Sequence, residues 1–141
     1  MGVLHEDIEV GLSAFPDESF DYVVMNGSLQ QVKMPDSVFR EALRVGKNLL
    51  VGFPNFRHYS SRFQILSGGK VPVTPSLPFQ WYDTPNLHFL SISDFRDYCK
   101  MRGIRIQAFA SVSRSKKVRF LPNLFAENGL FLLSKMNPSP P

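Results

Sequence analysis

Long apolar runs alternate with polar turns and amphipathic segments over the first half of the chain. Phe20–Met25 and Asn48–Phe53 are nearly continuous apolar runs, a pattern typical of strands in a parallel sheet that is covered on both faces. Between them, Pro35–Val45 has apolar residues at helical spacing and begins with proline, which suits the first turn of a helix. Gly46 follows at the position of a left-handed helix cap. Strand, helix and strand at this spacing predict a right-handed βαβ unit.

The second half of the chain predicts two more helices and two more strands. One helix is expected over Arg57–Leu66, and another from Ile92 to about Arg102, preceded by Ser91 and Asp94 at the spacing of a capping box. The strands are expected over Ile104–Phe109 and Leu130–Leu133, and the apolar, proline-bearing stretch Phe120–Phe125 lies between them.

The stretch Val71–Phe95 interrupts this alternation. It holds the only tryptophan, Trp81, and four of the eleven prolines, so it cannot form a regular helix. Its aromatic content argues against disorder, and ordered loops of this length are usually functional. We therefore interpret it as a lid or recognition loop over a site made by the rest of the chain. The alternative is that Trp81 and Tyr82 belong to the core of a thin domain.

The composition indicates one small globular domain. The chain has 141 residues, of which 43% are hydrophobic and 20% charged. No apolar run has the length of a transmembrane helix, and the first ten residues carry acids where a secretion signal needs a basic region. The single Cys99 cannot form an internal disulfide, so we expect a cytoplasmic location. Its place on the apolar stripe of a helix indicates an inert thiol.

The basic charge is modest and partly local. The formal charge is +4, and one run, Arg114–Arg119, contributes four cations to it. Such a run could bind nucleic acid, but no aromatic residues are interleaved with these charges, as a single-strand binding surface requires. We interpret the run as a solvated loop between two strands and do not expect nucleic acid as a partner. Salt-dependent binding to DNA or RNA would support the other interpretation.

Polar residues follow the predicted strands where ligands usually bind. In open parallel sheets the site lies beyond the carboxyl ends of the strands, and the aromatic loop leaves from the same edge. Four of the candidates have a structural alternative: a turn residue at position 7, a loop-stabilising amide at 55, a solvent-facing charge at 57 and a packed imidazole at 88. The candidates for contact with a cofactor are Asp7, Asn26, Gly27 and Ser28, and those for contact with a substrate or partner are Asn55, Arg57, His58, Trp81, Tyr82, Asp83, Asn86 and His88.

Several chemistries lack their motif in this sequence. There is no cysteine or histidine cluster with zinc spacing, so we expect no metal. There is also no G-x-S-x-G nucleophile elbow, no phosphate-binding P-loop and no G-x-G-x-x-G. We assign no catalytic residue.

Several motifs together resemble a known family. Phe15–Val24 is similar to the fourth-strand motif of class I S-adenosylmethionine-dependent methyltransferases. In order along the chain, Val51–Phe56 (VGFPNF), Trp81–His88 (WYDTPNLH) and Leu121–Glu127 (LPNLFAE) resemble the MetW family of methionine biosynthesis. The strand motif is generic, whereas the other three segments in this order are specific. The match runs from about Val3 to Leu133.

The resemblance implies an α/β, Rossmann-like methyltransferase fold with a mostly parallel sheet and a final antiparallel strand. It implies a role in methionine biosynthesis, accessory to homoserine O-acyltransferase as its partner, and S-adenosylmethionine as the cofactor of the full-length family. Among the cofactor positions, Asp7 would match the acid on the adenine side, and Asn26–Ser28 would match the loop after the fourth strand.

The glycine-rich cofactor loop of these methyltransferases has no counterpart here. We therefore expect residues 1–135 to be the C-terminal part of such a domain, followed by a disordered tail at 136–141. We expect this chain not to bind S-adenosylmethionine tightly, and its exposed strand edge to favour self-association. Two functions stay open: an accessory binding module, or a fragment of an active methyltransferase.

Overall fold

The computed structural model describes residues 11–135. The expectations for Asp7, for the strand end near Val3 and for the tail at 136–141 lie outside these residues. The elements, in chain order, are η1 (Gly11–Ala14), β1 (Phe20–Asn26), η2 (Leu29–Gln31), α1 (Pro35–Val45), β2 (Gly46–Pro54), α2 (Tyr59–Gly68), α3 (Ile92–Met101), β3 (Ile104–Ser113), β4 (Lys116–Lys117), α4 (Pro122–Phe125) and β5 (Asn128–Lys135).

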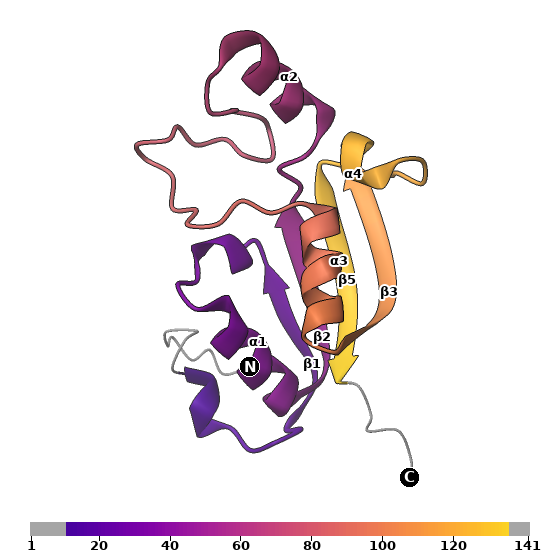
Figure 1. Cartoon of the computed structure of the whole chain (residues 1–141). Helices are drawn as coiled ribbons and strands as arrows, with labels where there is room; N and C mark the ends of the chain where they lie inside the picture. The colour runs from indigo at the N-terminus through magenta and orange to yellow at the C-terminus, as the bar shows by residue number, and fades with distance from the viewer. Residues whose placement is uncertain (1–10, 136–141) are drawn as a thin grey trace.

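The strands form one mixed sheet in the order β1-β2-β5-β3-β4. The pair β1 and β2 is parallel, and β5 is antiparallel to both β2 and β3. The strands β1, β2 and β3 therefore run in one direction, and β5, the last strand along the chain, runs against them, as the resemblance implied. Figure 1 shows α1 and α3 on the same face of this sheet.

Aromatic side chains fill the space between the helices and the sheet. Phe131 of β5 is fully buried, and its ring lies 4.8 Å from that of Phe95 on α3 and 5.8 Å from that of Phe53 on β2. Phe39 of α1 joins them at 5.7 Å from Phe95. Burial of each large ring contributes about 2–3 kcal/mol to stability, so this cluster fixes α1 and α3 against the sheet.

The prediction of a left-handed cap at Gly46 was wrong. Gly46 has an extended backbone, with φ −108° and ψ 139°, and begins β2 directly after α1. A Cβ at this position would lie 2.6 Å from Cγ2 of Val23 on β1. Glycine is therefore needed for close packing between the neighbouring strands and not for the end of the helix.

One face and one edge of the sheet are open in the described part of the chain. Within residues 11–135, β1 pairs only with β2. Tyr22 and Val24 on β1 are 63% and 62% exposed, and Leu50 beside them on β2 is 37% exposed. This open edge of β1 agrees with the exposed strand edge expected from the sequence. Self-association through this edge stays a prediction.

Candidate functional site

The carboxyl end of β1 turns sharply at Gly27. Gly27 has φ +70° and donates its N–H to the carbonyl of Gly52 on β2 at 2.9 Å. A Cβ on Gly52 would lie 2.6 Å from Oδ1 of Asn26 and 2.9 Å from Cδ2 of Leu130. Glycine at position 52 therefore allows the Asn26 side chain to lie across the end of β2. Ser28 then leads into η2 without a side-chain cap bond.

His88 attaches the aromatic loop to the segment that follows β1. Its Nε2 lies 2.9 Å from the carbonyl oxygen of Val32, so this nitrogen donates. The backbone N–H groups of Leu87 and His88 both donate to the carbonyl of Gln30, at 2.7 and 3.1 Å. The loop therefore does reach the carboxyl end of the sheet, as predicted, and His88 acts there as an anchor.

Gln64 of α2 holds the other end of the loop. Its side-chain amide donates to the carbonyl of Val73 and accepts from the N–H of Val73, both at 3.0 Å. Thr74 and Leu77 close a turn with a pair of backbone hydrogen bonds at 3.0 Å. The loop is thus fixed at both ends, which is the behaviour expected of an ordered recognition loop and not of a flexible linker.

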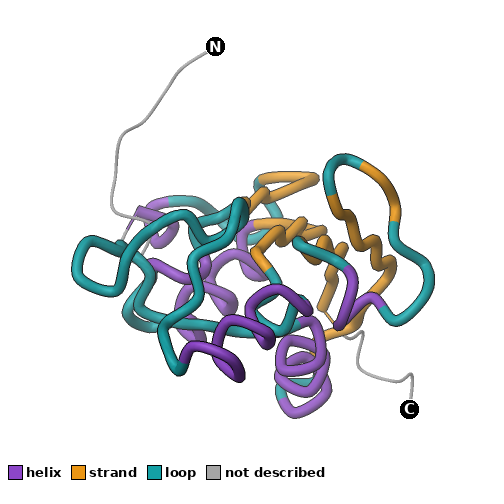
Figure 2. The backbone as a smooth tube through the Cα atoms, turned by 90° about the horizontal axis from the view of Figure 1, so that it is seen from above, coloured by secondary structure: helices purple, strands orange, loops and turns teal. Residues whose placement is uncertain are grey.

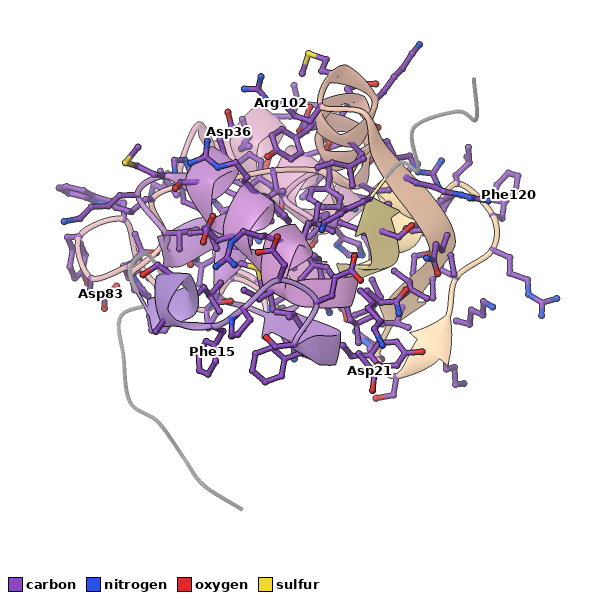
Figure 3. The ribbon with its side chains drawn as sticks, turned by 90° about the horizontal axis from the view of Figure 1, so that it is seen from below. Phe15, Asp21, Asp36, Asp83, Arg102 and Phe120 are labelled. Atoms are coloured by element: carbon purple, nitrogen blue, oxygen red, sulfur yellow. The ribbon has the colours of Figure 1, made fainter. Side chains whose placement is uncertain are left out.

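The side chains at the tip of the loop face solvent. Trp81 and Tyr82 are each 71% exposed, and their rings meet edge to face at 5.6 Å. The alternative that they belong to the core is therefore wrong. Figure 3 shows Asp83 on the outer bend of the same loop. The loop also encloses a cleft of about 220 Å³, lined by Phe79, Trp81, Asn86 and Phe89 among others.

α2 presents its apolar residues to solvent beside this loop. Tyr59, Phe63 and Leu66 are 52%, 68% and 88% exposed. Figure 1 shows α2 directly beyond the loop, at the carboxyl end of β2. In Figure 2 the teal loop projects from the end of the molecule opposite the β3 hairpin. We call the exposed apolar side chains of these two segments the aromatic cap: Tyr59, Phe63, Ile65, Leu66, Val71, Phe79, Trp81, Tyr82, Leu87 and Phe89.

Asn55 is a structural residue of the loop after β2. It is fully buried, and its Nδ2 donates to the carbonyls of Asn123 and Ala126 at 3.1 and 2.9 Å. Its Oδ1 accepts from the N–H groups of Arg57 and Ile92 at 3.3 and 3.4 Å. All of these partners are backbone groups, so no hydrogen-bonding capacity points outward. The alternative of a loop-stabilising amide holds for Asn55.

His58 is the N-cap of α2 and is 6% exposed. Its Nδ1 lies 2.7 Å from Oγ of Ser60, and Arg57 beside it is exposed. Burial lowers the pKa of His58, against an opposing contribution from Glu127. The imidazole is therefore neutral in the folded protein near neutral pH.

This shift predicts a dependence of stability on pH. Because the folded pKa of His58 is lowered below its ordinary value of 6.5, the unfolded chain binds the proton more readily. The stabilisation is complete above that value, and the free energy of unfolding falls as the pH drops below it. His58→Asn keeps a helix cap and should flatten this slope in urea titrations at about pH 7.5 and about pH 5.5. An unchanged slope would contradict the assignment.

The candidate residues form three groups and not one catalytic constellation. The first group is Asn26, Gly27 and Ser28, which η2 joins to His88. The second group, Asn55 to His58, surrounds the start of α2. The third group, Trp81 to Asn86, forms the outer tip of the loop. Sequence reasoning missed Gln30, which is 3% exposed and accepts both loop N–H groups. The available signals were its place shortly after a predicted strand and the likeness of Leu29–Gln31 to the MetW family.

The described residues hold no cluster of metal ligands, and their one cysteine is buried. Among residues 11–135, no group of three or more His, Cys, Asp or Glu side chains lies close enough to bind a metal ion. Cys99 is fully buried, and burial raises the pKa of its thiol to about 11. No helix in the part of the chain that the structure describes is long and apolar enough to cross a bilayer.

The described residues do not fit S-adenosylmethionine by themselves. The N–H of Gly27 is already bonded to Gly52, and the Asn26 side chain covers that glycine. The loop after β1 in residues 11–135 therefore has its backbone amide already engaged, and we derive no step through the cofactor.

Comparison with known proteins agrees with the fold. The chain is similar to a possible histamine N-methyltransferase from Thermotoga maritima, with a TM-score of 0.56 and 19% identity, over 86% of this chain and 58% of that one. It is also similar to a methyltransferase from Archaeoglobus fulgidus, described as S-adenosylmethionine-dependent, with a TM-score of 0.59 and 12% identity, over 94% and 66%. At these identities the likeness shows the fold alone.

Comparison of sequences identifies the family. The bifunctional methionine biosynthesis protein MetXA/MetW of Rhodopirellula baltica is 33% identical over 140 residues, which span 96% of this chain and 22% of that protein. The family described as methionine biosynthesis protein MetW matches residues 1–133. The chain belongs to the MetW family.

Proposed function

We propose that this chain is an accessory module of methionine biosynthesis that binds homoserine O-acyltransferase through the aromatic cap. The observation that carries the proposal is the exposure of Trp81 and Tyr82 on a loop that is fixed at both ends. Exposed apolar clusters of this kind mark interaction sites. Tryptophan and tyrosine are also the side chains that most often dominate binding energy at interfaces.

The relative from Rhodopirellula baltica supports this choice of partner. Its name combines MetXA and MetW in one polypeptide, which it describes as bifunctional. The MetW resemblance associates the family with the acyltransferase step. Two proteins that act together are often joined in one chain, because linkage raises their effective concentration for each other. We place the interaction in the cytoplasm, where the single Cys99 would stay reduced.

The charges around the cap indicate an acidic rim on the partner. Arg57, Arg62 and Lys70 are exposed on and beside α2, whereas Asp83 is an exposed acid of the loop. Complementary charges at an interface rim mainly raise the association rate and are screened by salt.

Calorimetric titration of the purified acyltransferase of the same organism with the intact chain tests the proposal. We expect a saturable complex whose affinity falls as salt is added. An absence of heat and of co-elution at low salt would overturn the proposal.

The second candidate is a methyltransferase, which the names and folds of the solved relatives favour. The residues at the end of β1 argue against cofactor binding by this chain alone. We therefore expect calorimetry with S-adenosylmethionine to give no micromolar binding. A micromolar dissociation constant for the purified chain would favour the methyltransferase instead.

A further inference from the structure

A second cleft lies between α1 and α3, near the start of β3 and the end of β5. It has a volume of about 520 Å³, and its lining includes Phe39, Arg40, Tyr98, Arg102 and Lys135. These residues come from three parts of the chain that are distant in the sequence: α1, α3 with its C-cap, and the end of β5. The cleft shares no lining residue with the cleft inside the aromatic loop.

The cleft carries an excess of positive charge. Asp36 is its only lining carboxylate, and this side chain is paired with Arg102, as Figure 3 shows. The Tyr98 hydroxyl and Arg102 hold the pKa of Asp36 below its usual value, so the carboxylate stays ionised. Arg40 makes no direct ion pair within residues 11–135, although its charge acts on Asp36 one helical turn before it. Lys135 makes only a long ion pair, at 3.9 Å, with Glu18. One guanidinium and one ammonium group therefore remain available to an anion.

An apolar groove continues from the charged cleft. It has a volume of about 190 Å³, and its lining includes Leu29, Leu90 and Phe95. Phe39 and Tyr98 line both spaces, so they form the boundary between the charged and apolar parts. A ligand that filled both would need an anionic group at one end and an apolar portion at the other.

We propose that this cleft binds an amphiphilic anion, with a phosphate or carboxylate group at Arg40 and Lys135 and an aliphatic or aromatic portion over Phe39 and Tyr98. Guanidinium groups suit both anions because their N–H donors match the spacing of two oxygens. The apolar portion would displace water from the rings and gain free energy in proportion to the area it buries.

Calorimetry with four probes separates the two parts of the site. Octyl phosphate and octanoate carry both portions, octanol lacks the anion, and inorganic phosphate lacks the chain. We expect the two amphiphilic anions to bind at least about tenfold more tightly than octanol or phosphate, because each part adds its own contribution. Equal binding of octanol and octyl phosphate would overturn the proposal, and so would the absence of binding by every probe.

Variants locate the binding on the protein. Arg40→Gln should weaken octyl phosphate binding roughly tenfold, because a charge-assisted hydrogen bond is lost. Arg105→Gln, an exposed arginine on β3 outside the cleft lining, is the matched control and should leave binding unchanged. Equal losses in both variants would indicate non-specific attraction to a basic surface. If the chain bound only anionic phospholipid vesicles and not octyl phosphate, its cationic side chains would bind a membrane surface. The proposed binding site in the cleft would then be wrong.

Discussion

Replacement of Trp81 and Tyr82 by alanine is expected to abolish measurable binding to homoserine O-acyltransferase while leaving the fold intact. Both side chains are 71% exposed and touch each other edge to face, so their removal leaves no cavity in the core. Anchoring aromatic residues at interfaces contribute about 2 kcal/mol or more each. Together they would weaken the complex by roughly a thousandfold. Calorimetry of the single and double variants measures the loss.

A matched control separates a specific effect from a general loss of apolar surface. Tyr22 is 63% exposed on β1, away from the aromatic cap. Tyr22→Ala should bind the acyltransferase as the unmodified chain does, within about twofold. If the Tyr22 variant lost binding and the loop variants kept it, the partner surface would lie on the open face of the sheet.

Asn55→Ala is expected to lower the free energy of unfolding by about 3 kcal/mol, because it leaves buried backbone groups without a partner. The lost partners belong to two segments: the carbonyls of Asn123 and Ala126 in and just after α4, and the N–H of Ile92 at the start of α3. The substitution should therefore loosen the segment that joins the aromatic loop to α3. Urea denaturation followed by circular dichroism measures the change.

Asn48→Ala is the control for this variant. Asn48 lies on β2, whereas Asn55 follows that strand. Asn48 is only half-buried, and its side chain bonds to the carbonyl of Asp21 and to Gln107 near the surface. Its loss should cost about 1 kcal/mol or less. Equal costs at positions 48 and 55 would mean that the buried network around Asn55 is not what holds these segments together.

Local signals were sufficient for most of the fold. Pro35 and the apolar stripe placed α1 at Pro35–Val45, the bounds that the structure has. Ser91 and Asp94 form the predicted capping box at the start of α3. Gly103 adopts φ +62° after that helix, as a residue beyond a helix end commonly does. The helix starts and the turn after α3 depend on residues close together in the sequence. The chemistry of proline, serine, aspartate and glycine is therefore enough to predict them.

Features that depend on distant residues were not predictable in the same way. The role of Gly46 is set by contact with Val23 on another strand. Helical spacing puts Tyr59, Phe63 and Leu66 on one side of α2, but spacing alone does not indicate that this side faces solvent, as it does in the structure. The charged cleft between α1 and α3 is lined by Arg40, Arg102 and Lys135, which come from separate parts of the chain. No short sequence motif contains these three residues together.

Hydrogen–deuterium exchange of the intact chain, with and without homoserine O-acyltransferase, tests the aromatic cap as the partner surface most directly. The account predicts slower exchange in α2, residues 59–68, and in the loop at residues 71–89, with no change along β3, residues 104–113. Unchanged exchange in α2 and the loop when the complex is saturated, or protection confined to the sheet, would contradict it.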